Sequence, residues 1–471
     1  MIPIKTYQDL QAVGESEKER MAFVLSVISE AKSTQDYRTA ADAELYYKHQ
    51  NPSIMRAQQI VYDVLGRAMN DPFKPNNKIP CRFYFYFINQ AVQFLLGNGV
   101  SFGDAKTKET LGKMFDHDVK RLLRIALNGG VGFGFWNVDH LEVYGLAGSD
   151  GRPAFVPLYD EENGSIRAGV RWWQIDESKP LRASLFEEDG WTDYIRRKGE
   201  DMTVLVEKRP YVQIVAKSEA TGEEIYAGQN WPTFPVIPLY NVNRQSELVG
   251  GRQSIDAYDL MMSGLVNNVD EGNLLYWVIQ NAGGMDAADD QAFVERLKTI
   301  HVAHTEGDET ITPQSIQMNV APNETALTRL RDQMFEDFMA LDTRNIASGA
   351  ATATQIRAAY EPMLIKYNLL ESQVTEFILN LLQLLGIEDE PTYQPDTIVN
   401  KAEEVQVVMA AAEHLSDEYV TEKVLTILGD IDRIDDVKAQ RLREDTSRYE
   451  TPEQTEDETE ETVPETEAVE E

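Results

Sequence analysis

Two long amphipathic helical patterns between residues 235 and 353 constrain the fold of this chain more than any other feature. The first runs from about Arg252 to Val278 without a proline, and a helix of that length spans ~40 Å at ~1.5 Å per residue. Its apolar residues recur every three or four positions, as one buried helix face requires: Ile255, Tyr258, Met262, Leu265 and Val269. Pro235 and Pro238 favour an extended segment before it.

The second pattern begins at Pro322-Asn323-Glu324, where Asn323 is expected to be the N-cap and Glu324 suits the helix dipole. Its apolar stripe again steps by three and four: Leu327, Leu330, Met334, Phe338 and Leu341. Small residues around Gly349 then end the pattern and predict a mobile loop. Together the patterns predict two paired struts with a small head at one end and a loop at the other, not an active site.

The residues before the struts are expected to form one mixed α/β body, residues 1–250. Helical patterns cover residues 16–34, 54–70 and 106–128, and the aromatic-rich residues 79–97 are expected to form a helix or a mixed segment. Alternating apolar and polar residues then predict strands at 135–144, 154–159, 166–175, 182–186, 203–208 and 211–216. Asn163-Gly164 predicts a hairpin turn, because both residues accept positive φ.

The remaining elements are predicted from shorter signals. Between the struts, strands at Tyr276–Ile279 and His301–Ala303 are expected around a helix at Asp289–Thr299. After the loop, a long helix from Thr354 to Leu385 should kink at Pro362 and close at Gly386. Further helices follow to about Asp445, with a capping box at Asn400-Lys401-Ala402-Glu403, a start at Ser416 and an end at Gly429. The Glu- and Thr-rich residues beyond are expected to be disordered.

The formal net charge of −35 restricts the functions open to the chain. Residues 450–471 carry eleven acidic residues and no basic one, and most of the excess lies outside them. A DNA-binding domain presents a basic patch that replaces phosphate counterions, so this charge argues against a repressor or nuclease. The charge would let a polyanion slide through a conduit without being gripped. Solubility of a large assembly explains it equally well.

Cysteine content and hydropathy indicate a soluble protein of a reducing compartment. Cys81 is the single cysteine, so no disulfide can form within the chain, and its apolar neighbours favour a buried small hydrophobe over a nucleophile. The first sixteen residues do not resemble a signal peptide, and no apolar run approaches the ~20 residues of a membrane span.

A search for catalytic, metal or cofactor motifs gives no candidate. The sequence has no Gly-x-x-x-x-Gly-Lys-Ser/Thr phosphate loop, which disfavours a nucleotide hydrolase. The glycine-rich residues 128–134 precede a strand and lack dinucleotide spacing, so they predict a turn where backbones approach closely. His301 and His304 would point to opposite faces of a strand, and no acidic or cysteine partner stands at ligand spacing.

Several motifs, in order, resemble the portal proteins of tailed bacteriophages with Gram-positive hosts. The struts supply three motifs: Pro-x-x-Pro-Leu-x-Asn at residues 235–241, Ser254-Ile255-Asp256-Ala257-Tyr258-Asp259 followed by Ser263 and Asn267-Asn268, and Ser348-Gly349-Ala350 before a long helix. Upstream are Asn89-Gln90, Phe94 to Asn98, Gly130-Val131-Gly132, Leu158 to Glu161 and Arg171-Trp172-Trp173. Gly99 departs from the family, in which proline is common at that turn. The resemblance spans roughly residues 40–440 and rests on the order of individually weak motifs.

The resemblance implies an α+β portal fold built from named regions. These are a mixed α/β wing at 1–251, stem helices at 252–278 and 322–345, a small α/β clip at 279–321, a tunnel loop at 346–355, a kinked helix returning to the wing at 356–398, a helical crown at 399–445 and a disordered acidic tail at 446–471. It further implies a dodecameric ring at one vertex of the virion capsid, assembled in the host cytoplasm. Through this ring double-stranded DNA would be packaged and later ejected without sequence specificity. The implied partners are the terminase large subunit, a head-completion adaptor, and the major capsid and scaffolding proteins, with no membrane, cofactor or enzymatic activity.

The expected DNA-contacting residues belong to the loop and the second strut. Small and polar loop residues can make weak phosphate contacts: Thr343, Arg344, Asn345, Ser348, Gly349, Thr352, Thr354 and Gln355. Arg329 and Arg331 are possible basic residues of the channel, although a solvated helix face or an ion pair between subunits explains them equally well. A different head-tail structural protein, an adaptor or scaffold, is the alternative function, with a packaging enzyme as a weaker one.

Overall fold

The computed structural model describes residues 5–62, 67–70, 74–148, 152–217, 224–272, 276–280, 310–314, 321–344, 353–394, 401–429, 434 and 436–440. The chain divides into two compact units, Met1–Asp396 and Thr397–Glu471. Helices and strands are both well represented, so the predicted α+β class is confirmed.

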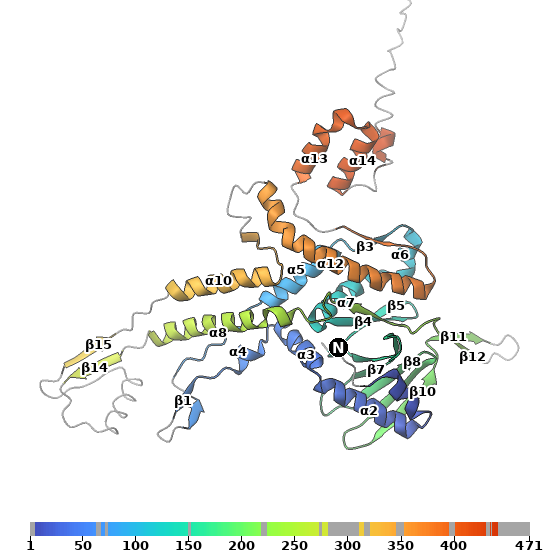
Figure 1. Cartoon of the computed structure of the whole chain (residues 1–471), viewed down its shortest axis with the longest axis horizontal. Coiled ribbons are helices and arrows are strands. Elements are labelled where there is room, and N and C mark those ends of the chain that lie inside the picture. The colour runs from blue at the N-terminus through green and yellow to red at the C-terminus, as the bar shows by residue number, and fades with distance from the viewer. Residues whose placement is uncertain are drawn as a thin grey trace, which may run out of the picture. The chain divides into compact units, whose positions relative to one another are not determined.

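An eight-stranded sheet organises the first unit (Figure 1). Its strand order is β10-β9-β8-β7-β6-β5-β4-β13, and every neighbouring pair is antiparallel except β5 with β6. The strands are β4 (Val131–Asn137), β5 (His140–Gly145), β6 (Ala154–Tyr159), β7 (Ile166–Trp173), β8 (Leu181–Glu187), β9 (Gly190–Arg196), β10 (Met202–Arg209) and β13 (Val236–Tyr240).

The structure corrects three details of the strand prediction. The single strand expected at 135–144 is a hairpin of β4 and β5, because Val138 takes a φ of 58° and turns the chain. Strand β9 was not predicted, although its buried residues alternate along Gly190, Thr192 and Tyr194. At Asn163-Gly164 only Gly164 has positive φ; the Asn163 side chain instead accepts a hydrogen bond from Ser165 N at 2.8 Å.

Helices of the first unit cover the sheet and extend beyond it. They are α1 (Tyr7–Val13), α2 (Glu17–Ser33), α3 (Gln35–Tyr47), α4 (Pro52–Arg56), α5 (Phe83–Leu96), α6 (Ala105–Leu111), α7 (Phe115–Gly129), α8 (Leu248–Gly272), α10 (Ala321–Asp337) and α12 (Ala353–Leu385). The single helix expected at 106–128 is therefore two, because Gly112 takes a φ of 80° and ends α6. Figure 1 shows α12 bending along its length; Pro362 lies inside this helix, and Gly386 follows its end with a φ of 70°.

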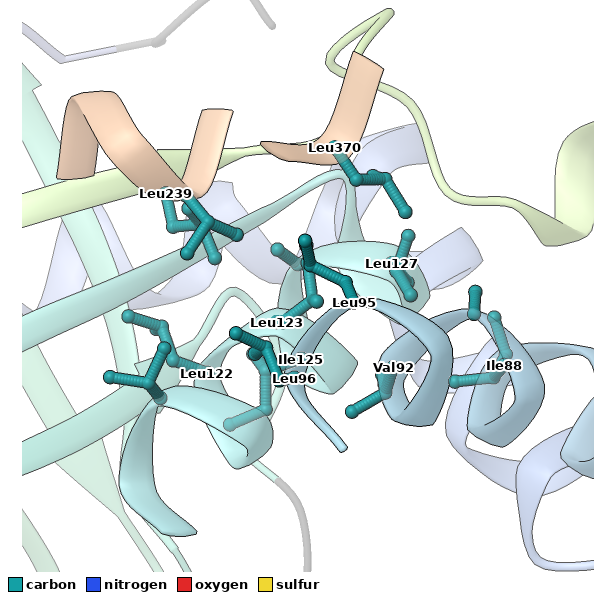
Figure 2. Packing of buried hydrophobic residues seen from close by; sticks show 14 of the residues in the cluster. Ile88, Val92, Leu95, Leu96, Leu122, Leu123, Ile125, Leu127, Leu239 and Leu370 are labelled. Carbon is teal, nitrogen blue, oxygen red and sulfur yellow. The ribbon is translucent and has the colours of Figure 1, made fainter. Parts of the chain in front are cut away.

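The largest core lies where α5, α7 and α12 pack together against β13. Figure 2 shows Leu95 and Leu96 of α5 packed with Leu122 and Leu123 of α7, while Leu239 of β13 and Leu370 of α12 close the same cluster. Each of these side chains is at most 1% exposed. Full burial of one such side chain stabilises the fold by about 1.5–3 kcal/mol, so this cluster fixes α12 to the body.

The helix expected at residues 54–70 is not formed. Its place is taken by α4 and a two-stranded hairpin of β1 (Ile60–Tyr62) and β2 (Ala68–Asn70). Ile60 and Met69 are 56% and 55% exposed, so an amphipathic helix has no core here in which to bury an apolar face. The β-branched and aromatic residues Ile60-Val61-Tyr62 favour strand pairing instead.

Three further hairpins or strand pairs complete the first unit. Strand β3 (Val100–Phe102) pairs with β16 (Pro391–Tyr393), β11 (Val212–Lys217) with β12 (Glu224–Gln229), and β14 (Tyr276–Gln280) with β15 (Thr310–Gln314). The expected strand at 301–303 and helix at 289–299 lie outside the described residues.

The second unit contains α13 (Lys401–Ala410), the short 3₁₀ helix η1 (Ala412–His414) and α14 (Asp417–Leu428). Ser416 caps α14 by accepting a hydrogen bond from Tyr419 N, and Gly429 ends it with a φ of 87°, which confirms both predictions. The predicted cap residue Asn400 and the acidic tail lie outside the described residues. Among the helices that the structure describes, none is long and apolar enough to cross a membrane.

Candidate functional site

Helices α8 and α10 form an antiparallel pair. The start of α8 lies against the end of α10, since a Cβ on Gly251 would come within 2.1 Å of the Phe338 ring. Ser254 Oγ also donates a hydrogen bond to Asp337 Oδ2 at 3.4 Å. In the sequence, strands β14 and β15 lie between the two helices. Figure 1 shows α8 and α10 side by side.

The apolar stripe predicted for the second strut is confirmed at Leu327, Met334, Phe338 and Leu341, all of which are buried. The helix boundaries differ from the expectation. Helix α10 begins at Ala321, so Asn323 lies inside its first turn and is not the N-cap. It ends at Asp337, and Met339 then takes a φ of 51° while Ala340 N donates to Phe335 O at 2.9 Å. That backbone turn keeps Phe338 and Leu341 in the core after the helix has ended.

A second face of α8 carries a buried polar stripe at intervals of four residues: Asp259, Ser263 and Asn267. Their side chains accept hydrogen bonds from the backbone of an extended segment, residues 74–82. Cys81 N donates to Asp259 Oδ1 at 2.8 Å, Ile79 N to Ser263 Oγ at 3.0 Å and Asn77 N to Asn267 Oδ1 at 2.7 Å. Alternate amides of an extended chain point the same way, so one polar helix face binds every second residue. We call this arrangement the α8 polar stripe.

Asp259 of the stripe and the nearby Asp256 also tie α8 to the helical part of the body. Asn51 Nδ2 donates to Asp259 Oδ2 at 2.5 Å, and Tyr46 OH donates to Asp256 Oδ1 at 2.5 Å. Burial raises the pKa of the Asp259 carboxyl above its ordinary value. A buried carboxylate that accepts several hydrogen bonds is costly to leave unpaired, so these contacts fix the position of α8.

The residues just after α10 are clamped by α5. Gln90 binds Leu341 at both backbone groups: Nε2 donates to Leu341 O at 3.0 Å, and Leu341 N donates to Oε1 at 2.9 Å. Tyr86 OH adds a hydrogen bond to the same carbonyl at 3.2 Å. Leu341 is therefore held in a fixed place, two residues before Thr343, where the predicted loop begins.

An ion pair with Arg331 holds Asp342, the residue after Leu341. Arg331 Nη1 and Nη2 donate to Asp342 Oδ2 and Oδ1 at 2.5 and 2.7 Å, and the guanidinium lies 4.3 Å from the centre of the Phe335 ring. The hydrogen bond to Asp342 raises the pKa of the Arg331 guanidinium above its ordinary value. Arg344 is exposed, with Nε 3.8 Å from Asp342 Oδ1.

Helix α12 reaches the same junction through Lys366, which is buried. Its Nζ donates to Phe338 O at 3.1 Å and to Glu247 Oε2 at 2.7 Å. Lys366 thus joins the end of α10 to the residue that precedes α8. Tyr360, Met363 and Tyr367 of α12 are buried beside it, so α12 is packed in place soon after it begins.

The structure describes some of the predicted site residues and not others. Thr343 and Arg344 follow the clamp, and Arg329 is exposed on α10. Arg331 is not a solvated residue but is paired within the chain. Thr354 and Gln355 lie in the first turn of α12, of which only the backbone is described, and Asn345, Ser348, Gly349 and Thr352 lie outside the described residues.

Sequence reasoning missed Asp342 and Lys366. It named Gln90 and the residues of the α8 polar stripe as parts of family motifs, but it did not predict their contacts. Lys366 could have been noticed, because it is the single charged residue on the apolar face formed by Met363, Tyr367 and Leu370. The spacing of Asp259, Ser263 and Asn267 likewise marks one helix face. Nothing local in the sequence indicates Gln90, whose partner is 251 residues away.

The glycine-rich residues 128–134 behave as predicted. Gly130 takes a φ of 81° and ends α7, and a Cβ there would come within 2.9 Å of Arg244 O. A Cβ on Gly132 would come within 2.8 Å of Leu122, and one on Gly134 within 2.6 Å of Phe377. These glycines allow close packing of α7 and α12 on β4.

The departure at Gly99 has a local cause. Its φ is 80°, which a proline ring cannot adopt, and a Cβ there would lie 2.5 Å from Asp116 Oδ2. Asp116 Oδ1 instead accepts a hydrogen bond from Val100 N at 3.2 Å.

In the part of the chain that the structure describes, no three His, Cys, Asp or Glu side chains are placed so that they could hold a metal ion. Cys81 is half-buried against the main core, and burial raises the pKa of its thiol, which keeps it protonated at neutral pH. His301 and His304 lie outside the described residues.

Comparison with known proteins gives a consistent result. The family model described as "Phage portal protein, SPP1 Gp6-like" matches residues 28–450. A portal protein of Clostridium phage phiCD119 is 22% identical over 401 residues, covering 78% of this chain and 84% of that protein. A portal protein of Bacillus phage SPP1 is 22% identical over 342 residues, covering 70% of this chain and 66% of that protein. A chain from a structure titled "Virion of native gene transfer agent (GTA) particle" aligns with a TM-score of 0.40 and 13% identity, over 73% of this chain and 89% of that chain.

Proposed function

Because the chain belongs to the SPP1 Gp6-like family of phage portal proteins, we propose that it forms a closed ring through which double-stranded DNA passes during packaging and ejection. Portal proteins are structural components of the virion at a capsid vertex, and they assemble there as oligomers. The ring is proposed to contain twelve copies. The two struts, α8 and α10, are the proposed stem of each copy.

The match to the portal family over residues 28–450 carries this proposal, and the clamp around Leu341 and Asp342 supports the part of it that concerns the loop. Gln90, Arg331 and Lys366 hold residues 338–342 against α5, α10 and α12. Buried residues of α12 fix the chain again from Tyr360 onward. A polymer-contacting loop between these two fixed points would begin and end at defined places on the scaffold.

The loop from Thr343 to Gln355 is proposed to enter the bore. Its small and polar residues would make weak phosphate contacts that do not depend on DNA sequence. The net charge of −35 supports passage of DNA without tight binding, and solubility of the assembly is served by the same charge. Arg331 is mostly buried in its pair with Asp342, whereas Arg329 and Arg344 are exposed, so these two are the proposed basic residues of the channel.

The other regions are assigned by the same proposal. The body up to residue 251 is the wing, residues 279–321 form the clip, and residues 399–445 form the crown. The clip is proposed to contact the terminase large subunit during packaging and a head-completion adaptor afterwards. Major capsid and scaffolding proteins are the further proposed partners.

The family is structural, and we propose that this chain has no enzymatic activity of its own. The purified protein should neither hydrolyse nucleotides nor cleave DNA. Either activity, if it persisted through purification to homogeneity, would contradict this part of the proposal.

Electron microscopy of the purified protein, with its mass from light scattering, tests the ring. We expect class averages with an open central hole and a mass of about twelve chains. A compact particle without a bore would overturn the proposal. Replacement of Ser348 and Gly349 by bulky residues should then impair DNA packaging while rings still form, and wild-type packaging by that variant would remove the loop from the mechanism.

A further inference from the structure

The β1–β2 hairpin is small and exposes apolar side chains. Each strand has three residues, and neither pairs with another strand among those described. Ile60 and Met69 on the two strands are 56% and 55% exposed, and Met55 at the end of α4 is 47% exposed. An isolated two-stranded hairpin is marginally stable in water, so contact with a partner would stabilise this one.

The two arms that carry the hairpin are firmly held. Before it, Asn51 binds Asp259 of α8, and Asn51 is 1% exposed. After it, residues 77, 79 and 81 bind the α8 polar stripe. Lys78 Nζ donates to Met55 O at 2.6 Å and joins the two arms. Figure 1 shows β1 beside α4 and apart from the eight-stranded sheet. The hairpin is thus presented from a rigid base.

The charge of this region differs from that of the rest of the chain. Residues 56–78 contain four basic residues and two acidic ones, whereas the whole chain has a net charge of −35. Arg56 and Lys74 are exposed. A basic, apolar surface on an acidic chain is complementary to another copy of the same chain.

We propose that the β1–β2 hairpin docks on the neighbouring copy in the ring, and that this contact buries the exposed side chains of Met55, Ile60 and Met69 of the docking chain. This inference rests on the proposed ring. A closed ring needs two different complementary surfaces on each chain, and a hairpin on a rigid base supplies one of them. The open strand edges can add backbone hydrogen bonds to the apolar contact.

The test replaces both strand residues, Ile60→Asp and Met69→Asp, in the full chain. Light scattering across a series of protein concentrations, with micrographs at each, measures ring assembly. We expect the concentration at the assembly midpoint to rise at least about tenfold, because two apolar contacts would be lost to buried charge. The matched control is Met114→Asp with Ile175→Asp, whose side chains are 58% and 79% exposed elsewhere on the body, and its midpoint should not move.

The outcomes separate this inference from the ring itself. If the wild-type chain forms no ring, the proposed function fails and the docking falls with it. If wild type and the hairpin double variant assemble with the same midpoint, the docking alone is overturned. Should that variant fail to fold, a photo-crosslinking residue in place of Ile60 gives the second measurement: it should yield covalent multimers in the assembled ring, and recovery of monomer alone would reject the docking.

Discussion

Arg331 and Asp342 form a two-pronged ion pair across the end of α10, with nitrogen–oxygen distances of 2.5 and 2.7 Å. Asp342 Oδ1 also accepts a hydrogen bond from Arg344 N at 3.1 Å. The pair therefore couples the second strut to the root of the proposed loop.

Arg331→Ala should lower the free energy of unfolding by about 1–2 kcal/mol, because Asp342 would keep its charge and lose both hydrogen bonds from the guanidinium. Partial solvent access limits the loss. Urea unfolding followed by tryptophan fluorescence measures it. Arg331→Lys should recover only part of the stability, since an ammonium cannot reproduce the planar fork. Arg329→Ala on the exposed face of the same helix is the control and should change stability by less than ~0.5 kcal/mol; equal losses at both positions would show that the ion pair is unimportant.

Met339→Gly should stabilise the chain. Met339 has a φ of 51°, which costs a residue with a Cβ roughly 1–2 kcal/mol relative to glycine. Greater chain entropy of glycine in the unfolded state offsets part of this, so we expect a net gain of about 0.5–1 kcal/mol. The melting temperature should rise accordingly. A lower melting temperature would mean that side-chain contacts of Met339 outweigh its backbone conformation.

Asp259→Asn tests the α8 polar stripe through pH. Burial raises the pKa of Asp259 in the folded state, so the folded protein binds this proton more tightly than the unfolded chain does. The contribution of Asp259 to stability is therefore greatest below the unfolded pKa of about 3.9 and falls as pH rises through the folded pKa. Asparagine does not titrate, and its amide nitrogen cannot accept the hydrogen bond from Asn51.

The stability of wild type minus that of Asp259→Asn should therefore shrink as pH rises from about 4 to 7. Calorimetric melting of both proteins at matched pH values gives this difference directly. The contributions of the other carboxylates cancel, because both proteins contain them. A difference that grows with pH would mean that Asp259 is stabilised as a carboxylate, contrary to the effect of its burial.

The periodicity of apolar residues was sufficient to predict a helix or strand where that element buries one face within its own unit. The stripe of α10 and most strands of the large sheet follow this rule, because Leu327, Met334, Val170 and Leu185 face a core that every allowed arrangement must bury. The hairpin at residues 60–70 broke it. Ile60 and Met69 remain exposed on this chain, so their spacing carried no information about a helix.

The proposed site depended on contacts that sequence reasoning cannot assign. Cys81 binds Asp259 across 178 positions, and Gln90 binds Leu341 across 251. A polar side chain on a helix face can bind water or the backbone amide of a residue far away in the sequence. Only the fold decides which of these two partners it has. The family motifs located the region, but they did not predict the clamp.

Gly134 and Gly264 should respond in opposite ways to replacement by alanine, because one is crowded and the other is not. A Cβ on Gly134 of β4 would come within 2.6 Å of the buried Phe377 ring, so Gly134→Ala should overpack the contact between β4 and α12 and cost about 1–3 kcal/mol. Gly264, inside α8, has open space around its Cβ position. Gly264→Ala should therefore stabilise the helix by about 0.5–1 kcal/mol, since alanine loses less backbone entropy. Thermal unfolding of the two variants beside wild type should shift in opposite directions. Destabilisation by Gly264→Ala in isolated chains would contradict the open surroundings, whereas a loss confined to assembled rings would place that face of α8 against a neighbouring copy.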